Sequence, residues 1–179
     1  AISVGLVEAG TAFFQYGSSL YYYYCTDHLV TSYISPAGNG ALKGGKEFTV
    51  PGTFCLGDGT NAAGTLTRWV RDLLYSREVA GERQGGENAY AVMAREAAEI
   101  PPGSNGLMML PYLYGERSPL QDPSATAMLF GLKGSHTRRE INRAALEAVG
   151  YSTMQHLILF DELGLPPRRL ITAGGGTKN

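Results

Sequence analysis

Three glycine-containing turns carry the residue types that suit a phosphate-bearing ligand. They are Gly17–Ser19, with the sequence GSS, the stretch from Gly57 to Gly64, and Gly174–Gly176, which follows a short apolar run. Successive backbone N–H groups that point into a turn form a concave anion site, and serine hydroxyls add donors without adding charge. Each turn alone is usually plain loop geometry. The presence of all three favours a ligand with a phosphate tail.

Two common phosphate-binding motifs are absent from the sequence. No G-x-G-x-x-G opens a βαβ unit, and no G-x-x-x-x-G-K-[S/T] is present. We therefore set aside dinucleotide-binding Rossmann enzymes and P-loop NTPases. The last glycine turn follows the run from Leu170 to Ala173, which predicts a short buried strand, and glycine there lets the backbone approach a ligand closely.

No acidic residue stands out as a catalytic base. Asp58 lies in the glycine-rich stretch and is predicted to occupy a turn, while Asp122, followed by Pro123, has the pattern of a helix cap. His136 comes just before a capping threonine and is interpreted as a surface or loop-packing residue. Turn or helix-surface positions are expected for the remaining aspartates, Asp27, Asp72 and Asp161.

Other charged and aromatic residues receive structural interpretations. Glu116 and Arg117 could meet a phosphate or a neighbouring domain, but we favour a local ion pair that holds their loop. Arg138 and Arg139 oppose the dipole at a helix start and are expected in solvent. Trp69 and the tyrosine-rich stretch are assigned to the core, since no basic stripe accompanies these rings to form a nucleic-acid surface.

Composition limits the class of protein. A chain of 179 residues with 44% hydrophobic residues can bury a core as one globular domain. Its 15 basic and 16 acidic residues leave no basic excess, which argues against nucleic acid and anionic membranes as partners. Apolar runs fall short of the ~20 residues that a membrane span needs. Cys25 and Cys55 have no C-x-x-C spacing, so neither zinc nor a disulfide is indicated, and the expected location is cytoplasmic.

The first third of the chain reads as strands. Residues 11–27 predict a hairpin whose turn is Gly17–Ser19, and the tyrosines at 21–24 should alternate between the two faces of the sheet. Residues 35–46 are predicted to be a surface loop. A further strand is expected at 53–56, ending in the turn GDGT.

Helices dominate the remainder. Residues 62–75 place five apolar side chains on one helical stripe, and a second helix is expected near 90–98. A buried strand is predicted within 106–113 and a short helix from Asp122 to about Phe130. Thr137 and Glu140 have capping-box spacing and should begin the longest helix, which ends near Gly164. The five stripe residues are Leu66, Trp69, Val70, Leu73 and Leu74.

Longer motifs resemble those of one enzyme family. The stretch from Ala127 to Glu147, AMLFGLKGSHTRREINRAALE, resembles the second signature of the FGGY carbohydrate kinases. Upstream, YGERSPLQDPSATA is similar to the G-E-R-[T/S]-P…D-P segment of the xylulose-kinase branch, and the final LITAGGGTKN is similar to the adenosine motif. The opening residues 1–20 resemble the stretch with a phosphate-contacting Gly-Thr-Ser turn, and AAGTLTRWVRDLL resembles the family's helix beside the nucleotide.

The resemblance implies a fold and a domain. It implies an α/β domain of the ribonuclease H-like, actin-like ATPase type, with a mixed sheet flanked by helices. Residues 1–179 would form a single truncated domain, most of the C-terminal, ATP-side domain of a two-domain sugar kinase. The N-terminal sugar domain and the last C-terminal helices would be absent, and the present chain would be a fragment.

Site residues also follow from the matched motifs. Gly17, Ser18 and Ser19 would face the β- and γ-phosphates of ATP, with Ser18 in place of the family's usual threonine. Gly64 and Arg68 would border the nucleotide. The adenosine or α-phosphate would lie against the residues of the last turn, Gly175, Gly176 and Thr177.

The implied reaction transfers the γ-phosphate of ATP, with Mg²⁺, to a hydroxyl of a ketopentose such as xylulose. The family's base is an Asp in a G-x-D-x-x-A segment upstream of Ala1, so this fragment alone should be inactive and provides neither a catalytic residue nor a metal ligand. Relatives act on ribulose, gluconate or glycerol. The expected partners are ATP, a small sugar or polyol and the N-terminal domain, with a homodimer possible. A non-catalytic nucleotide-binding regulator of the actin-like ATPase class stays open as an alternative.

Overall fold

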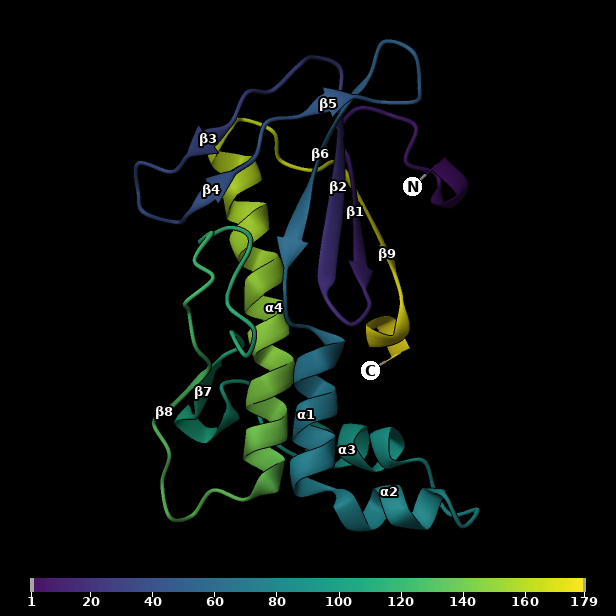
Figure 1. Ribbon diagram of the computed structural model, residues 1–179, viewed down its shortest axis with the longest axis vertical. Helices are drawn as coiled ribbons and strands as arrows, with labels where there is room; N and C mark the ends of the chain where they lie inside the picture. Colours follow the sequence, from purple (N-terminus) through teal and green to yellow (C-terminus); the bar gives the residue numbers. More distant parts are fainter. Residues whose placement is uncertain (1, 179) are drawn as a thin grey trace.

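The computed structural model describes residues 2–178, so Ala1 and Asn179, which belong to the first and last motifs, lie outside the described residues. A five-stranded sheet forms one half of the molecule, and α4 runs from that sheet to a group of helices beyond its lower end (Figure 1). The elements are η1 (Ile2–Val4), β1 (Thr11–Tyr16), β2 (Leu20–Thr26), β3 (Tyr33–Ile34), β4 (Ala41–Leu42), β5 (Lys46–Glu47), β6 (Phe54–Thr60), α1 (Gly64–Leu74), α2 (Ser76–Glu82), α3 (Ala89–Ala98), η2 (Ser104–Gly106), β7 (Met108–Leu110), β8 (Met128–Phe130), α4 (Arg138–Glu162), β9 (Arg169–Ala173) and η3 (Gly175–Lys178).

The sheet is mixed, as predicted. Its strand order is β5-β6-β2-β1-β9, with β9 parallel to β1 and the other neighbours antiparallel. The predicted hairpin is confirmed, because β1 and β2 pair from Ala12 with Tyr24 to Tyr16 with Leu20. Since parallel strands end at the same edge of a sheet, the residues that follow β1 and β9 lie side by side.

The tyrosines of β2 alternate between the faces as expected. Tyr22 and Tyr24 are fully buried against Leu159 and Phe160 of α4, and the Tyr24 and Phe160 ring centroids are 4.8 Å apart. Tyr23 lies on the other face, beside a smaller cluster formed by Leu6, Phe13, Cys25 and Cys55. Both faces of the sheet are therefore covered, but the face toward α4 carries the larger core.

Helix α4 has the predicted start and end. Thr137 caps it, and Glu140 Oε2 accepts a 2.8 Å hydrogen bond from the Thr137 backbone N–H, which completes a capping box. Gly164 follows the helix with φ +71°, a conformation that favours glycine. Ala144, Ala145 and Ala148 are buried against α1, α3 and β7, so small side chains let these elements approach closely.

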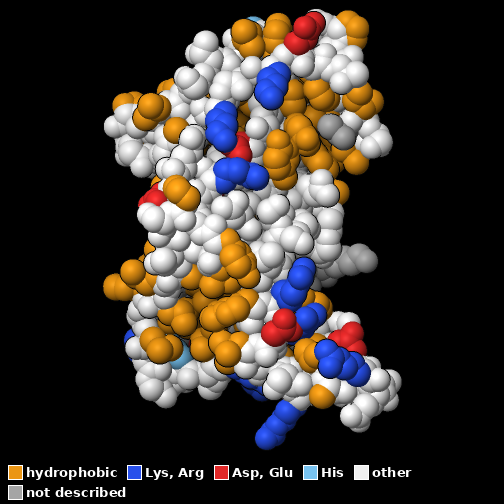
Figure 2. All heavy atoms as spheres, in the orientation of Figure 1, with side chains coloured by type: hydrophobic (Ala, Val, Ile, Leu, Met, Phe, Trp, Pro, Cys, Tyr) orange, Lys and Arg blue, Asp and Glu red, His pale blue; other side chains and the backbone are white. Residues whose placement is uncertain are grey.

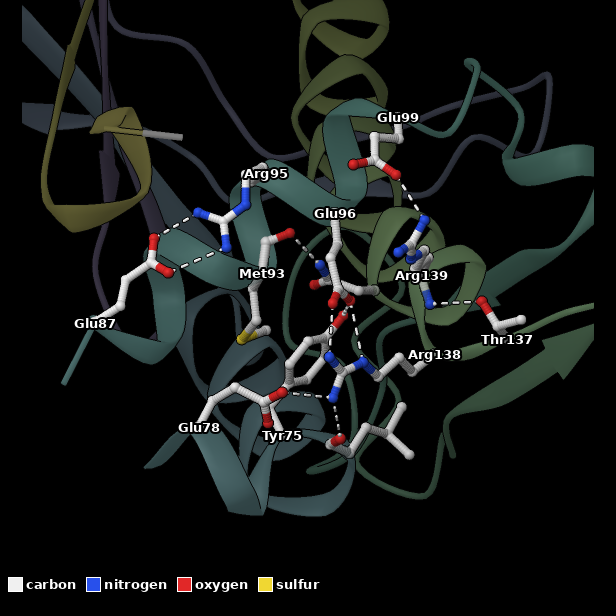
Figure 3. Close-up of polar contacts among 12 residues, drawn as sticks. Tyr75, Glu78, Glu87, Met93, Arg95, Glu96, Glu99, Thr137, Arg138 and Arg139 are labelled. Carbon is white, nitrogen blue, oxygen red and sulfur yellow. Dashed lines mark hydrogen bonds and ion pairs between the residues drawn. The ribbon is translucent and has the colours of Figure 1, made fainter. Parts of the chain in front are cut away.

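An ion cluster joins the helices, and it corrects the expectation that Arg138 is solvated. Arg138 Nη1 lies 2.9 Å from Glu78 Oε1 of α2, and its Nη2 lies 2.6 Å from Glu96 Oε1 of α3 (Figure 3). Tyr75 donates a 2.8 Å hydrogen bond to Glu96, and the Arg138 guanidinium stacks over its ring. The attraction of these carboxylates outweighs the unfavourable helix dipole.

The predicted turn GDGT is wrong, because Gly57–Thr60 is the second half of β6. Tyr22 is paired with Asp58 and Leu20 with Thr60. The glycines here permit close strand approach, since a Cβ on Gly59 would lie 2.0 Å from the Leu20 carbonyl oxygen. A polar strand of this kind is tolerated because Asp58 finds cationic partners, described below.

Four further expectations require correction. The predicted loop 35–46 contains the short strand β4, which pairs with β3, and the first residue of β5. No helix follows Asp122; its Oδ1 instead accepts bonds from Ser124 in a turn, and the next apolar residues pair with β7 as β8. On the α1 stripe only Leu66 and Val70 are fully buried, while Trp69 and Leu73 are exposed. Strand β9 lies at the sheet edge with Leu170 exposed rather than buried.

No helix within residues 2–178 is long and apolar enough to cross a membrane.

Candidate nucleotide-binding site

The hairpin turn Gly17–Ser19 is compact and faces solvent in part. The Gly17 N–H donates a 3.0 Å hydrogen bond to the Ser19 carbonyl, which closes the turn. Ser18 is exposed, and the hydroxyls of Ser18 and Ser19 have no hydrogen-bond partner within residues 2–178. The turn therefore presents two hydroxyl donors that the described chain does not use.

The start of α1 packs directly on this turn. The Gly64 N–H donates to the Gly17 carbonyl at 2.9 Å, and the Ala63 and Thr65 N–H groups donate to the Ser18 carbonyl at 3.2 and 2.9 Å. The Thr65 hydroxyl adds a 3.0 Å bond to the same oxygen. The turn thus caps the helix, and the first N–H groups of α1 are directed at the turn rather than at solvent.

Gly64 is required by this contact. A Cβ at this position would lie 2.5 Å from the Gly17 carbonyl oxygen and 3.5 Å from the Ser18 Cα, both of which are backbone atoms. Any larger residue must push the hairpin turn away from the helix.

The glycine turn that follows β9 lies next to the hairpin turn, because β9 is the neighbour of β1 in the sheet. β9 pairs with β1 as far as Ala173 with Gln15, so the next residues of the two strands are neighbours. A Cβ on Gly174 would lie 2.3 Å from the Tyr16 carbonyl oxygen, and one on Gly176 would lie 2.8 Å from the Tyr16 Cβ. Thr177 closes the turn, because its hydroxyl donates a 2.8 Å bond to the Gly174 carbonyl. The residue between the two turns is Tyr16, immediately before Gly17.

The structure therefore brings the predicted residues of both turns and Gly64 together at one end of the sheet. Arg68 lies one helical turn after Gly64, with an exposed side chain and no ion-pair partner within residues 2–178. Trp69 beside it is 38% exposed. The side chains of α1 that follow the turn thus include one cation and one aromatic ring that solvent reaches.

A polar cluster next to this site was not anticipated from the sequence. Asp58 is buried in β6, with Arg117 Nε 2.8 Å from its Oδ1 and Lys43 Nζ 3.4 Å from its Oδ2. Arg117 Nε also donates a 2.9 Å bond to the Gly59 carbonyl, at the edge of β6. The expected local ion pair between Glu116 and Arg117 is replaced by this longer-range one. The GER segment in the sequence indicated that Arg117 takes part in an ion pair. No residue near it in the sequence indicated that Asp58 is the partner.

Glu116 is buried beside this pair without a cation of its own. Its Oε1 accepts a 3.0 Å hydrogen bond from the Arg117 backbone N–H, while Oε2 has no partner within residues 2–178. Burial raises the pKa of Glu116 to about 7, and the hydrogen bond and the nearby Arg117 charge only partly oppose that rise. At neutral pH this carboxyl is therefore only partly ionised.

The turns themselves are not enclosed. A pocket of about 530 Å³ lies instead between the β3–β4 ribbon and residues 119–121, and none of the predicted site residues lines it. In residues 2–178 no group of three or more His, Cys, Asp or Glu side chains is placed to hold a metal ion. The candidate site is thus an open surface built from backbone and hydroxyl groups.

Comparison with models of protein families identifies the relatives of this chain. Residues 23–179 match the model described as "FGGY family of carbohydrate kinases, C-terminal domain". This chain belongs to the FGGY family of carbohydrate kinases. The earlier resemblance is confirmed, and the match includes the stretch from α1 to the last glycine turn.

Several FGGY relatives are similar over most of the chain. Gluconokinase of Bacillus subtilis is 37% identical over 123 residues, which cover 69% of this chain and 24% of the relative. Xylulose kinase of Escherichia coli is 26% identical over 179 residues, covering 100% of this chain and 34% of the relative. The chain therefore spans about a quarter to a third of the length of these relatives.

Solved structures agree with the predicted fold. The crystal structure of xylulose kinase from Rhodospirillum rubrum superposes with a TM-score of 0.80 at 30% identity, covering 99% of this chain and 32% of that one. Glycerol kinase from Plasmodium falciparum, at 19% identity and a TM-score of 0.70, shares the fold. The ribonuclease H-like, actin-like ATPase fold expected for an FGGY kinase domain is thus confirmed.

Proposed function

We propose that this chain is the ATP-side domain of an FGGY sugar kinase whose whole protein transfers the γ-phosphate of ATP to a hydroxyl of a ketopentose such as xylulose. The observation that supports it best is the meeting of the Gly17–Ser19 turn, Gly64 and the Gly174–Gly176 turn at one end of the sheet. Gly64, Gly174 and Gly176 approach neighbouring atoms too closely to carry a Cβ, and a phosphate-binding surface needs the same close backbone geometry.

The residues present fit the phosphates of ATP. Ser18 and Ser19 offer hydroxyls without partners in the described chain, and Arg68 offers a cation on the following helix turn. We propose that Ser18 and Ser19 hold the β- and γ-phosphates, that Gly64 and Arg68 border the nucleotide, and that the adenosine or α-phosphate lies on the last turn. The residues of that last turn are Gly175, Gly176 and Thr177.

Mg²⁺ would neutralise charge on the transferring phosphoryl group. The described residues fit it poorly as a protein-held metal, since no acidic cluster is present and the turns carry no carboxylate. The phosphates and water would therefore supply most of its ligands. In the same proposal this chain positions the nucleotide, while the base, an Asp upstream of Ala1, and the sugar pocket belong to the N-terminal domain.

The sugar itself is the finer part of the proposal. The fold similarity to xylulose kinase at 30% identity supports a ketopentose. Gluconate is the second candidate, because gluconokinase of Bacillus subtilis is 37% identical over two thirds of the chain. Both substrates place the reacting oxygen on a short polyhydroxylated chain, so the same ATP side serves either.

A kinase assay on the full-length protein tests the proposal. ADP release is measured with xylulose, ribulose, gluconate and glycerol, first for the wild type and then for Ser18→Ala/Ser19→Ala. We expect activity on one sugar and a KM for ATP raised roughly 10-fold or more, the effect of losing a hydrogen bond to a charged group. The KM for the sugar should stay unchanged.

Ser76→Ala is the matched control, because Ser76 is an exposed serine on α2 away from the turns. An unchanged KM for ATP in the double variant would refute the assignment of the turn. A full-length protein that binds ATP but phosphorylates none of the sugars would support the regulatory alternative instead.

A further inference from the structure

The loop 114–118, which carries the GER segment, holds the end of β6. Strand β5 pairs with only the first two residues of β6, so the rest of that edge has no strand partner within residues 2–178. The Gly59 carbonyl accepts two hydrogen bonds from the loop, one from Arg117 Nε at 2.9 Å and one from the Ser118 N–H at 3.2 Å. The loop therefore satisfies a backbone group of β6 where a neighbouring strand ends.

The same loop holds the connection between β6 and α1. Asn61 Nδ2 donates hydrogen bonds to the carbonyls of Tyr114 and Gly115, at 3.1 and 3.4 Å. A short step along the chain, the Gly64 N–H donates to the Gly17 carbonyl of the hairpin turn at 2.9 Å. The connection thus runs from its contacts with the loop directly into the contacts between α1 and the hairpin turn.

Arg117 adds a buried charge to these contacts. Its Nε lies 2.8 Å from Asp58 Oδ1 as well as within hydrogen-bond distance of the Gly59 carbonyl. Asp58 Oδ1 in turn accepts a 2.9 Å hydrogen bond from the Gly59 N–H. Asp58 is only 4% exposed, so these charge-assisted bonds are little screened by solvent. Arg117, Asp58 and the Gly59 backbone therefore form one firmly bonded unit at the end of β6.

Lys43 is a second cation on the same carboxylate. Its Nζ lies 3.4 Å from Asp58 Oδ2, and its side chain is 55% exposed. Figure 2 shows basic side chains beside a small acidic area in the upper half of the molecule, where Figure 1 places β6. Of the two cations, only Arg117 also donates to the backbone of β6. The two side chains share the neutralisation of Asp58 but differ in their contact with the strand.

We propose that Arg117 is a positioning residue for the nucleotide site. It fixes Gly59, and through the short connection to Gly64 it sets where α1 begins and how the hairpin turn lies against that helix. The inference rests on the proposed function, because the turn must hold the phosphates of ATP for its placement to affect the reaction. A misplacement of ~1 Å is enough to impair the alignment of reacting groups.

The double variant Asp58→Asn/Arg117→Met of the full-length protein separates placement from charge. It contains no unpaired buried carboxylate, but Gly59 loses its bond from Arg117. We expect the KM for ATP to rise roughly 10-fold, the effect of losing a hydrogen bond to a charged group, while the KM for the sugar stays unchanged. Lys43→Met is the matched control, because it removes a cation from the same carboxylate without touching the strand, and its KM for ATP should equal that of the wild type.

Amide hydrogen exchange of the nucleotide-free proteins gives a second readout. The N–H groups of Ala63, Gly64 and Thr65 bond to the hairpin turn, so they report whether α1 still begins against it. Their exchange should quicken roughly 10-fold in the double variant, while amides in the middle of α4 exchange as in the wild type. If the double variant does not fold, Asn61→Ala replaces it and should change the KM for ATP and the exchange in the same direction, by smaller factors.

The outcomes distinguish this proposal from the proposed function. An unchanged KM for ATP in the double variant, unchanged exchange at residues 63–65, or equal effects of Lys43→Met would overturn the positioning role of Arg117. A wild type that does not turn over ATP would refute the proposed function instead. The exchange measurement needs no nucleotide, so it would still decide whether Arg117 holds the start of α1.

Discussion

Arg138 at the start of α4 reaches Glu96 in the middle of α3, with its Nη2 2.6 Å from the carboxylate Oε1. The same guanidinium contacts Glu78 and lies over the Tyr75 ring, so one side chain joins α2, α3, α4 and the end of α1. Figure 3 shows the carboxylates converging on it. The helices of this domain are therefore held together by an ion-pair cluster as well as by apolar packing.

Replacing Arg138 should destabilise the domain strongly. In Arg138→Met the two carboxylates lose their cation, and we expect a loss of ~2–3 kcal/mol in the free energy of unfolding. This is less than for a fully buried pair, because the arginine side chain is about one-third exposed. Urea unfolding measures it. Arg139→Met, which breaks the exposed pair with Glu99, should cost under ~1 kcal/mol. Equal losses would contradict a special role for Arg138.

Gly64→Ala should disturb the candidate site more than the fold. The new Cβ must displace the Gly17 carbonyl from the helix start, and overpacking of this kind costs ~1–3 kcal/mol. We also expect a higher KM for ATP in the full-length protein. Gly150→Ala is the control within α4, where a Cβ meets nothing within 4 Å, and it should stabilise by ~0.5–1 kcal/mol. An unchanged KM for Gly64→Ala would separate the hairpin turn from nucleotide binding.

Glu116→Gln should change how stability depends on pH. The folded-state pKa of Glu116 is about 7, above its ordinary value, so the wild type loses the contribution of the protonated group as pH rises from ~4.5 through 7. The Gln variant should therefore gain stability relative to the wild type over that window, up to ~3 kcal/mol above pH 7, with no gain below pH 4.5. Urea midpoints at several pH values measure it. A constant difference at all pH values would contradict the raised pKa.

His156 should make the protein less stable as the pH falls, whereas Glu116 makes it less stable as the pH rises. It is fully buried in α4, where Nδ1 lies 2.7 Å from the Ser152 carbonyl and Nε2 lies 3.2 Å from the Ser118 hydroxyl. Burial lowers its pKa, so the folded state keeps the ring neutral and stability falls as pH drops below the ordinary value of ~6.5. In a Glu116→Gln background, unfolding midpoints should fall between pH 7 and 5. Adding His156→Gln should remove that slope, and a slope that persists would assign it to other groups.

Sequence patterns were sufficient where the signal is local. The capping box of Thr137 and Glu140 and the glycine turn between two tyrosine- and phenylalanine-rich strands are complete within a few residues, and both are confirmed. The glycine turns are likewise recognisable in the sequence alone. Their meeting in space depends on β9 lying parallel to β1, which no single segment specifies.

The sequence-based predictions were wrong where a residue distant in the sequence determines the local structure or burial. Asp58 is in a strand because Arg117, far along the chain, compensates its charge, and Arg138 is held by two acids on other helices. Phe130 is in a strand because Met108 pairs with it. Trp69 follows the apolar stripe of α1, yet the described chain does not cover it, so periodicity alone could not assign its burial.

The contact between α1 and the hairpin turn has an electronic consequence. The Gly17 carbonyl belongs to the peptide unit that carries the Ser18 N–H, and the Ser18 carbonyl belongs to the unit that carries the Ser19 N–H. Both oxygens accept hydrogen bonds from the positive end of α1. Acceptance at one end of an amide polarises it and strengthens donation at the other. The helix dipole is thereby relayed through two peptide groups, and the Ser18 and Ser19 amides become better donors to any anion that settles on the turn.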